Sequence, residues 1–462
     1  MMSDTDVRET LGSRLGFLLL SVGCAVGLGN VWRFPYIVGK YGGGMFVLLY
    51  LVFLLLLGYP ILMMELAIGR SAHKGLVGAY RTLANRGKSW WAGIARIIFL
   101  GNALLMMYYT TVSGWLVAYS GYYVNGSLSK LETPETIGTF FNNLIASPGR
   151  MVFYTLLVVA VGALLCCGGL RKGVENSVKY MMLVLFGIMF IMVFKALTLP
   201  NASSGLEFYL VPNWSNFSSN IVETVFAAMG QAFFTLSLGV GSMEIFGSYL
   251  GWKKSLFKEC CSIILLDTLI ALMAGVIIFA ACASYNVDAA SGPGLIFLSL
   301  PNVFNQMAYG QVWGICFFVF LSLAAMTTVV AVFENLIAFL MDEFKFSRLN
   351  ASLAVGLGMA VLAMPCAMGF NLLSGFKPFG DGSTVLDLED FLVSQNLLPL
   401  GALMSVIFCS YGFGWGQDKF FAECEEGQRW KYPRFFRYYC RLVLPLILIL
   451  VLVMEYWKFF GN

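Results

Sequence analysis

The chain contains eleven apolar segments, each long enough to cross a lipid bilayer as a helix. One crossing needs about 20 apolar residues. Of the 462 residues, 59% are hydrophobic and only 12% are charged, a balance that soluble domains do not have. We therefore predict an all-α polytopic membrane protein embedded in a lipid bilayer. The predicted spans are 13–37, 43–70, 90–124, 151–169, 175–198, 221–250, 257–284, 313–343, 346–370, 386–416 and 434–459.

Basic residues alternate between loops and predict the orientation of the chain. Lys and Arg follow the second, fourth and sixth spans, whereas 199–220 and 285–312 contain neither. Because cytoplasmic loops are enriched in these residues, we predict a cytoplasmic N-terminus and, after an odd number of spans, an external C-terminus. The charged run 423–437 is interpreted as a solvated cytoplasmic loop.

Composition also narrows the function. The eleven cysteines lie mostly in apolar segments and form no CxxC pair, so neither disulfides nor zinc is predicted. The net charge of +4 comes from loop residues and does not indicate a nucleic-acid partner. The lone His73 has no nucleophile near it in a catalytic arrangement, so we do not predict an enzyme.

The first span is interrupted by residues that disfavour a helix. The run 23–35 (GCAVGLGNVWRFP) contains three glycines, an asparagine, an arginine and a proline. A membrane helix tolerates such a break where the freed backbone lines a cavity or packs against protein. Two interpretations stay open here: carbonyl groups that hold a cation or polar ligand, or a glycine-rich packing face with a kink.

A second interruption, 230–242 (GQAFFTLSLGVGS), lies in the sixth span. Spans one and six would begin two five-helix halves, 13–198 and 221–416. Interrupted helices at matching positions indicate a midplane binding site in a transporter built from inverted repeats. The remaining segments are then a cytoplasmic N-terminal segment, 1–12, an external loop, 199–220, and a cytoplasmic loop with the eleventh helix, 417–462.

The chain carries four short motifs: 27–35 (GLGNVWRFP), 42–44 (GGG), 233–239 (FFTLSLG) and 339–348 (FLMDEFKFSR). Together they resemble the neurotransmitter:sodium symporter family, and especially its bacterial amino-acid transporters. The resemblance covers nearly the whole chain. It implies a five-plus-five inverted repeat with discontinuous helices 1 and 6, alternating access, and coupling to sodium.

The resemblance implies two sodium sites made of oxygen ligands, which suit a hard cation. Without the resemblance, adjacent threonines such as those at 327 and 328 are more simply hydroxyls bonded to their own helix. The first site would consist of the Ala25 carbonyl, Asn30, Thr235 and Asp267, with the carboxylate of the substrate. The second would consist of the Gly23, Val26 and Ala324 carbonyls with the hydroxyls of Thr327 and Thr328.

The resemblance also implies an amino-acid site between the two broken helices. Tyr109 would meet the carboxylate, Ser237 and nearby carbonyls would meet the ammonium group, and Phe234 would cover the substrate. The apolar residues among the implied contacts could equally be part of the hydrophobic core. The implied contacts are Cys24, Ala25, Leu28, Gly29, Leu105, Tyr109, Phe234, Thr235, Ser237, Val240, Met243, Thr328 and Val332.

The resemblance further implies that one charged pair closes the substrate path on each side of the membrane. Arg33 and Asp390 would close the outside. Arg8 and Asp342 would close the cytoplasmic side, with Tyr249 nearby, although Arg8 also fits a simple cytoplasmic anchor. Glu65, inside the second span, would brace the unwound part of span six or be a protonated structural carboxyl.

Departures from the family pattern refine the substrate and ion requirements. Monoamine-transporting members carry aspartate where this chain has Gly27, which favours amino acids as substrates here. Chloride-dependent members carry asparagine and serine where Asp267 and Ala271 stand, so we expect Asp267 to supply the charge and transport to need no chloride. Many members have twelve spans instead of eleven, which leaves the oligomeric state open.

We therefore predict a secondary symporter that imports amino acids, hydrophobic or aromatic ones, with two sodium ions. Its short external loops favour a bacterial inner (plasma) membrane. The alternatives are a non-transporting amino-acid sensor and a symporter of a small polar amino acid. Accumulation driven by a sodium gradient separates a transporter from a sensor, which binds without accumulating.

Overall fold

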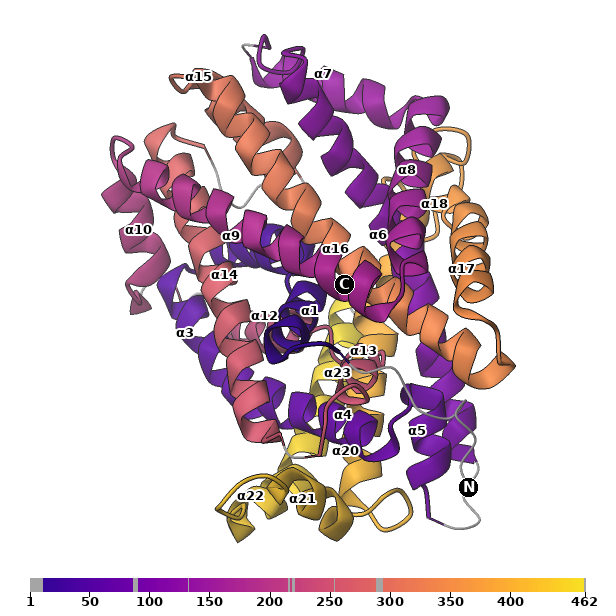
Figure 1. Ribbon diagram of the computed structural model, residues 1–462. Helices are drawn as coiled ribbons and strands as arrows, with labels where there is room; N and C mark the ends of the chain where they lie inside the picture. The colour runs from indigo at the N-terminus through magenta and orange to yellow at the C-terminus, as the bar shows by residue number, and fades with distance from the viewer. Residues whose placement is uncertain are drawn as a thin grey trace.

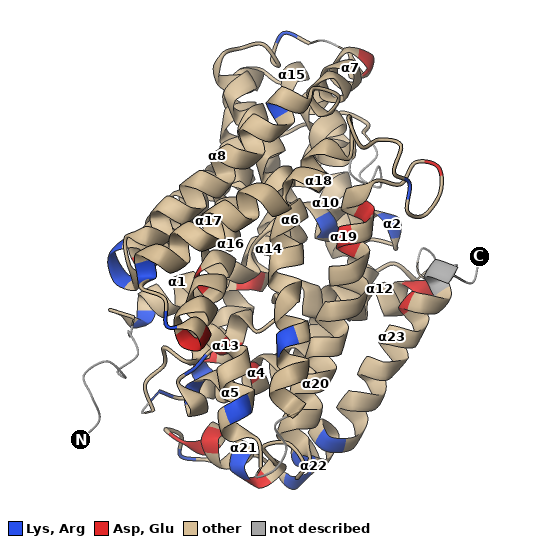
Figure 2. Ribbon diagram, turned by 90° about the vertical axis from the view of Figure 1, so that its right-hand side faces the viewer, with Lys and Arg blue, Asp and Glu red and all other residues tan. Residues whose placement is uncertain are grey.

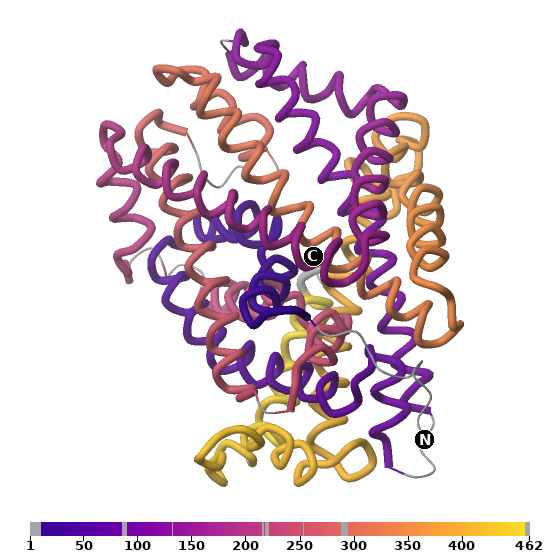
Figure 3. The backbone as a smooth tube through the Cα atoms, viewed as in Figure 1, coloured from indigo at the N-terminus to yellow at the C-terminus, as the bar shows by residue number. Residues whose placement is uncertain are grey.

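The computed structural model describes residues 11–85, 90–131, 133–214, 217, 221–252, 254–287 and 294–460. The regular secondary structure of this part of the chain is helical, apart from one isolated antiparallel bridge between Gly43 and Pro212. Figures 1 and 3 show the helices packed side by side as one bundle. The predicted all-α class is therefore confirmed.

Within the described residues, nine helices are long and apolar enough to cross a bilayer, and one bent pair adds a tenth crossing. The interrupted sixth segment supplies the eleventh predicted span. The nine are α3–η2–α4 (Gly44–Ala72), α6 (Trp90–Val124), α8 (Pro148–Cys167), η3–α9 (Leu170–Leu197), α14 (Leu256–Ser284), α16 (Gly310–Phe344), α17–α18 (Arg348–Met368), α19–η5–α20 (Val385–Ser410) and α22–η6–α23 (Arg434–Trp457).

The bent pair is the first span, and it breaks where the sequence predicts. Helix α1 (Arg14–Ala25) ends at Val26, whose backbone is extended. The chain resumes as the π-helical turn η1 (Gly29–Arg33) and α2 (Phe34–Lys40), with a bend of 55°. Pro35 lies in the first turn of α2, where its missing amide hydrogen costs nothing. The carbonyls at the end of α1 are therefore released from regular helix pairing.

The sixth span is divided into α12 (Ile221–Phe234) and α13 (Ser242–Gly247). Between them the backbone has positive φ at Ser237 (51°), Gly239 (94°) and Gly241 (82°). A Cβ on Gly239 would lie 2.0 Å from the Leu398 carbonyl oxygen. Only glycine combines this φ with so close an approach to α20. Both broken helices that the sequence predicts are therefore present.

The broken helices lie inside the bundle, and uninterrupted helices surround them (Figure 1). Helix α1 packs against α9, α14 and α16, while α13 packs against α4 and α16. The outer helices expose large apolar side chains such as Leu164, Phe194 and Val361. Such a surface suits a hydrocarbon solvent, because soluble proteins rarely expose large apolar patches.

Short helices cover the two ends of the bundle. Helices α7 (Pro134–Ile145) and η4–α15 (Leu295–Gln306) lie at one end, and α5 (Leu76–Leu83) and α21 (Gln417–Glu425) at the other (Figure 1). The segment predicted as an external loop, 199–220, contains a further helix, α10 (Ala202–Leu210). Figure 2 shows many Lys and Arg segments at the end that carries α5, α21 and α22.

The interpretation of the charged run 423–437 as a solvated loop fits the exposed residues 429–431 but is wrong for Glu423. Glu423 belongs to α21 and is buried, and it does not lie in a solvated loop. Its carboxylate is 2.5 Å from Nε of Arg70, which is itself fully buried near the end of α4. Arg70 also donates to the Lys254 carbonyl oxygen at 2.6 Å. A buried guanidinium attracts a buried carboxylate because neither is stable alone at that depth.

Candidate functional site

Three buried side chains from different spans meet beside the first break. Asn30 Nδ2 donates to Asp267 Oδ1 at 2.9 Å and to Thr235 Oγ1 at 3.0 Å, and the Thr235 hydroxyl donates to Asp267 Oδ2 at 2.9 Å. All three side chains are fully buried. The remaining Asn30 oxygen, Oδ1, has no hydrogen-bond donor in the described part of the chain. We name these three side chains the first oxygen cluster; a cation would give the Asn30 oxygen the partner it lacks.

A second oxygen cluster surrounds the hydroxyl of Thr328 on α16. The Thr328 oxygen lies 3.3 Å from the Gly23 carbonyl, 3.5 Å from Cys24, 3.4 Å from Val26 and 3.4 Å from Ala324. One hydroxyl hydrogen can serve only one of these four acceptors well. The carbonyls therefore converge on a point that suits a hard cation better than a single hydroxyl. The neighbouring Thr327 hydroxyl donates to the same Ala324 carbonyl at 2.8 Å.

A cavity of about 330 Å³ lies between the two broken helices, α6 and α19–α20. Ten of the predicted substrate contacts line it. They are Cys24, Ala25, Leu28, Gly29, Leu105, Tyr109, Phe234, Ser237, Val240 and Thr328. The lining is mostly apolar with a few polar groups, as is usual for small-molecule sites.

Three predicted contacts do not line this cavity. Thr235 belongs to the first oxygen cluster instead, and Met243 and Val332 are buried outside the cavity wall. Besides Arg33 and Asp390, residues that the sequence analysis did not propose as substrate contacts complete the wall. They are Gly27, Trp32, Tyr36, Tyr108, Val112, Leu386, Asp387 and Leu398. Leu386 and Asp387 could have been found from Asp390, because residues three and four apart share a helix face.

Tyr109 connects the cavity to the break in the first span. Its hydroxyl accepts a hydrogen bond from the Leu28 amide at 3.3 Å. A Cβ on Gly27 would lie 2.4 Å from that hydroxyl and 2.9 Å from Thr328 Oγ1. Glycine at position 27 therefore leaves the space that the Tyr109 hydroxyl occupies. On the other broken helix, Ser237 Oγ donates to the Cys24 carbonyl at 3.1 Å and ties the two breaks together.

The predicted outer pair, Arg33 and Asp390, shares the wall of the same cavity. The Arg33 guanidinium carbon lies 4.2 Å from the centre of the Phe234 ring, a cation–π contact. Asp390 accepts a hydrogen bond from Ser394 Oγ at 2.6 Å. Among the ion pairs of the described residues, none joins Arg33 to Asp390 within 4.0 Å.

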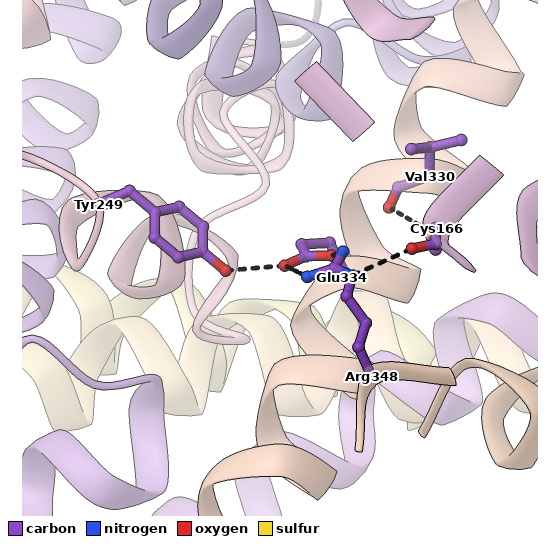
Figure 4. A network of polar contacts seen from close by, with 5 residues as sticks. All are labelled: Cys166, Tyr249, Val330, Glu334 and Arg348. Carbon is purple, nitrogen blue, oxygen red and sulfur yellow. Dashed lines mark hydrogen bonds and ion pairs between the residues drawn. The ribbon is translucent and has the colours of Figure 1, made fainter. Parts of the chain in front are cut away.

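Away from the residues that line the cavity, a polar network joins α8, α16 and α17 to the segment that follows α13 (Figure 4). Tyr249, just after α13, donates to Glu334 Oε1 on α16 at 2.9 Å. Arg348, at the start of α17, forms an ion pair with Glu334 and donates to the Cys166 carbonyl of α8 at 3.1 Å. The sequence analysis placed Tyr249 near the pair predicted to close the cytoplasmic side. It did not identify Glu334 and Arg348 as the partners of Tyr249. The sequence does contain a signal for Glu334, because a carboxyl group inside the eighth predicted span is costly unless it has a partner.

Of the pair predicted to close the cytoplasmic side, the structure describes only Asp342. Arg8 lies outside the described residues. The Asp342 carboxylate accepts from the Gly75 amide at 3.4 Å. Glu65 does brace the unwound segment, because its Oε1 accepts from the Gly239 amide at 2.6 Å.

A helix bundle with two broken spans, two oxygen clusters and a cavity between them defines a membrane transporter rather than an enzyme. The chain matches the profile of the sodium:neurotransmitter symporter family over residues 8–143 and 139–461, and it belongs to that family. This confirms the resemblance, the sodium dependence and the non-enzymatic class that the sequence predicts.

Relatives and a solved structure agree with this assignment over nearly the full length. The uncharacterized sodium-dependent transporter YhdH of Bacillus subtilis is 33% identical over 95% of this chain and 96% of its own length. An uncharacterized sodium-dependent transporter of Haemophilus influenzae is 32% identical over 98% and 99%. The crystal structure of MhsT in complex with L-phenylalanine matches with a TM-score of 0.85 and 33% identity, covering 98% of this chain and 100% of MhsT.

Proposed function

We propose that this protein imports hydrophobic or aromatic amino acids together with two sodium ions by alternating access. The observation that carries the proposal is the position of the cavity, which lies between two oxygen clusters at the breaks of both interrupted helices. Half-helix ends and released carbonyls are suited to a zwitterion and to sodium.

The first oxygen cluster would bind one sodium ion. In this proposal Asn30 Oδ1, Thr235 Oγ1 and an Asp267 oxygen are ligands, with the Ala25 carbonyl and the substrate carboxylate. Sodium would break the present hydrogen bonds within the cluster and replace them with ion contacts. Because the substrate completes the shell, sodium and substrate would each raise the affinity for the other.

The second oxygen cluster would bind the other sodium ion. The Gly23, Val26 and Ala324 carbonyls and both threonine hydroxyls would be ligands there. This ion would join α1 to α16, which are distant in sequence. Two sodium ions moving through about 100 mV and a tenfold gradient supply roughly 7 kcal/mol per cycle, enough to concentrate a neutral zwitterion strongly.

The substrate class follows from the cavity wall and from the related structure. The wall is apolar around Leu105, Val112 and Leu398, and the volume of about 330 Å³ suits a single amino acid. MhsT, whose structure matches this chain, was solved with L-phenylalanine. Gly27 leaves no side-chain carboxylate to hold an amine, so the substrate would bring its own.

The arrangement supports an outward-facing state. The network around Glu334 ties α8, α13, α16 and α17 together on one side, whereas no ion pair closes Arg33 onto Asp390 among the described residues. The side that carries α5 and α21 would be cytoplasmic, in agreement with its Lys and Arg segments (Figure 2). We propose a bacterial inner membrane as the location, and an inverted repeat of 13–198 and 221–416 as the basis of the switching.

A competition screen tests the proposed substrate. Purified protein in liposomes would take up labelled L-phenylalanine under an inward sodium gradient, with each of the other common amino acids added in excess. We expect aromatic and large aliphatic amino acids to compete, and small polar ones to leave uptake unchanged. Competition by glycine or serine alone would favour a small polar substrate. Sodium-dependent binding without accumulation would favour a sensor.

A further inference from the structure

Two buried carboxyl groups outside the oxygen clusters face each other between α4 and α13. They belong to Glu65 on α4 and Glu244 on α13, which are 0% and 1% exposed. The two carboxyl groups lie close enough for the charge of one to act on the other. The helices touch at the backbone, because a Cβ on Gly69 would lie 1.8 Å from the Glu244 carbonyl oxygen. Figure 1 shows α4 and α13 next to each other. We name these two residues the carboxyl pair.

Three of the four oxygens of the carboxyl pair lack a donor. Glu65 Oε1 accepts from the Gly239 amide at 2.6 Å. Glu65 Oε2 and both Glu244 oxygens have no well-formed hydrogen bond in the described part of the chain. Buried carboxylate oxygens without donors are costly, and native proteins rarely leave them so. The pair therefore lacks a donor or a positive charge.

The groups that face the carboxyl pair do not supply that charge. The Ser405 hydroxyl faces Glu244 and lies 3.0 Å from the Tyr80 hydroxyl, so these two already share a hydrogen bond. The titratable neighbours that surround the pair in the described structure are thiols and a phenol, none of them cationic. They are Cys24 on α1, Tyr80 on α5 and Cys409 on α20.

The nearest cation along α4 is already engaged elsewhere. Arg70 lies about 1.4 turns beyond Glu65 by helix geometry. Its guanidinium is held by Glu423 and by the Lys254 carbonyl. A second negative charge at the carboxyl pair would therefore have no counter-ion, and two carboxylates in contact cannot both stay ionised in such a site.

We propose that Glu65 and Glu244 together form a proton-binding site that holds one shared proton. The proton comes from solvent, forms one O–H bond on either carboxyl, and lowers the negative charge of the pair by one. The protonated carboxyl then donates to the other, so that one proton engages two of the three oxygens that lack a donor. This is the arrangement of two carboxyl groups sharing one proton.

The proton site is joined to the substrate cavity through the unwound segment. Gly239, which binds Glu65, lies between Ser237 and Val240, and both of these line the cavity. Loss of the proton would set two charges against each other and force α13 away from α4, which would move this wall. Resting on the proposed function, substrate binding and proton binding then favour each other.

Infrared spectroscopy tests the proton site without requiring transport. A protonated carboxyl absorbs in a region where carboxylates do not. Full-length wild-type protein should show such a band that disappears at alkaline pH. Glu65→Gln and Glu244→Gln should each lose it, because the amide becomes the donor and the remaining carboxylate ionises. Glu389→Gln removes another buried carboxyl whose oxygens have no donor, on α19, and is the matched control. It should lose only the absorption of Glu389 itself and keep the band that Glu65→Gln and Glu244→Gln both lose. Identical spectra for wild type, Glu65→Gln and Glu244→Gln would overturn the proposal.

A binding titration tests the link to the cavity. The Kd for L-phenylalanine in saturating sodium should rise in the wild type by up to about tenfold per pH unit above the titration of the pair. Glu244→Gln should flatten this dependence, and Glu244→Met, of similar size, should do the same if the glutamine variant folds poorly. An equal pH dependence in wild type and both variants would contradict the link. A wild type that binds no amino acid with sodium would refute the proposed function, and the infrared result would still decide the proton site.

Discussion

The side-chain amide of Asn30 donates to the carboxylate of Asp267 at 2.9 Å, although the two residues belong to different spans far apart in sequence. Both are completely buried, and Thr235 bridges them from the second broken helix. This relationship fixes η1, α12 and α14 around one point. In the proposed function this carboxylate would be the charged ligand of the first oxygen cluster, and the next two predictions depend on it.

Asp267→Asn should weaken sodium binding without unfolding the protein. The change keeps the shape of the side chain and removes the charge that would meet the ion. Hydrogen bonds and contacts to charged groups contribute about 1.5–3 kcal/mol, so we expect the half-saturating sodium concentration to rise roughly tenfold to a hundredfold. Sodium titration of L-phenylalanine binding measures this. Asp381→Asn removes a charge from an exposed loop and is the control. An unchanged sodium requirement in Asp267→Asn would show that Asp267 is not a sodium ligand.

Chloride should be dispensable for uptake. We expect Asp267 to supply the negative charge inside the protein, and position 271 is an alanine, which offers no hydroxyl to an anion. Replacing chloride by gluconate at constant sodium should leave the initial rate of uptake unchanged in the wild type. A steep chloride requirement would show that the carboxylate does not serve as the compensating charge.

Thr328→Val should abolish efficient sodium-driven accumulation. The hydroxyl stands among four carbonyl oxygens, and a methyl group there would repel a cation from the second oxygen cluster. We expect accumulation to fall by about tenfold or more, corresponding to at least ~1.4 kcal/mol. Because Thr328 also lines the cavity, Thr327→Val should be measured beside it and should show a smaller loss.

Thr110→Val is the matched control for both threonine variants. Its hydroxyl donates at 2.7 Å to the Met106 carbonyl one turn earlier in α6, so only a local helix contact is lost. Accumulation should stay near the wild-type level. An equal loss in Thr110→Val and Thr328→Val would point to a general packing effect in place of an ion site.

Gly27→Ala should lower substrate affinity. The new methyl group would lie 2.4 Å from the Tyr109 hydroxyl, so the tyrosine would have to move from its contact with the Leu28 amide. We expect a rise in Kd of roughly tenfold or more, as for loss of one buried hydrogen bond to a charged group. Gly187→Ala, whose Cβ would meet no atom within 4 Å, should bind like the wild type. Tight binding by Gly27→Ala would show that Tyr109 does not position the substrate.

Glu423→Ala should destabilise the fold while leaving the cavity intact. It leaves the fully buried Arg70 without its carboxylate, and breaking a buried pair from one side costs about 3–5 kcal/mol. Thermal unfolding of the purified protein measures the change. Glu426→Ala removes an exposed carboxylate of the same segment and should unfold like the wild type. A Glu423→Ala protein as stable as Glu426→Ala would contradict the ion-pair account.

The sequence predicts the spans and both helix breaks because their causes are local. Apolar length defines a crossing, and the glycines at 239 and 241 adopt positive φ where the sixth span is interrupted. The meeting of Asn30, Thr235 and Asp267 has no local signal, and only the family resemblance suggested it. The same resemblance predicted Met243 and Val332 as substrate contacts, yet neither lines the cavity. Tertiary packing decides which face of a helix meets a cavity, and the sequence does not show that packing.

Charged side chains gave the least reliable predictions. A glutamate in a polar run looks solvated, but Glu423 is buried because its partner Arg70 lies on another span. Glu244 and Glu334 passed unnoticed within apolar spans, although an ionisable residue at that depth is itself a signal of function. Their partners come from other elements, and no spacing along the chain shows that.

Uptake against a gradient tests the central claim most directly. Protein reconstituted in liposomes should accumulate L-phenylalanine above the external concentration when sodium is high outside, and release it when a sodium ionophore collapses the gradient. With potassium in place of sodium, the internal concentration should not exceed the external one. Equal uptake with sodium and potassium, or no accumulation with the sodium gradient in either direction, would contradict a sodium-coupled amino-acid site between the two broken helices.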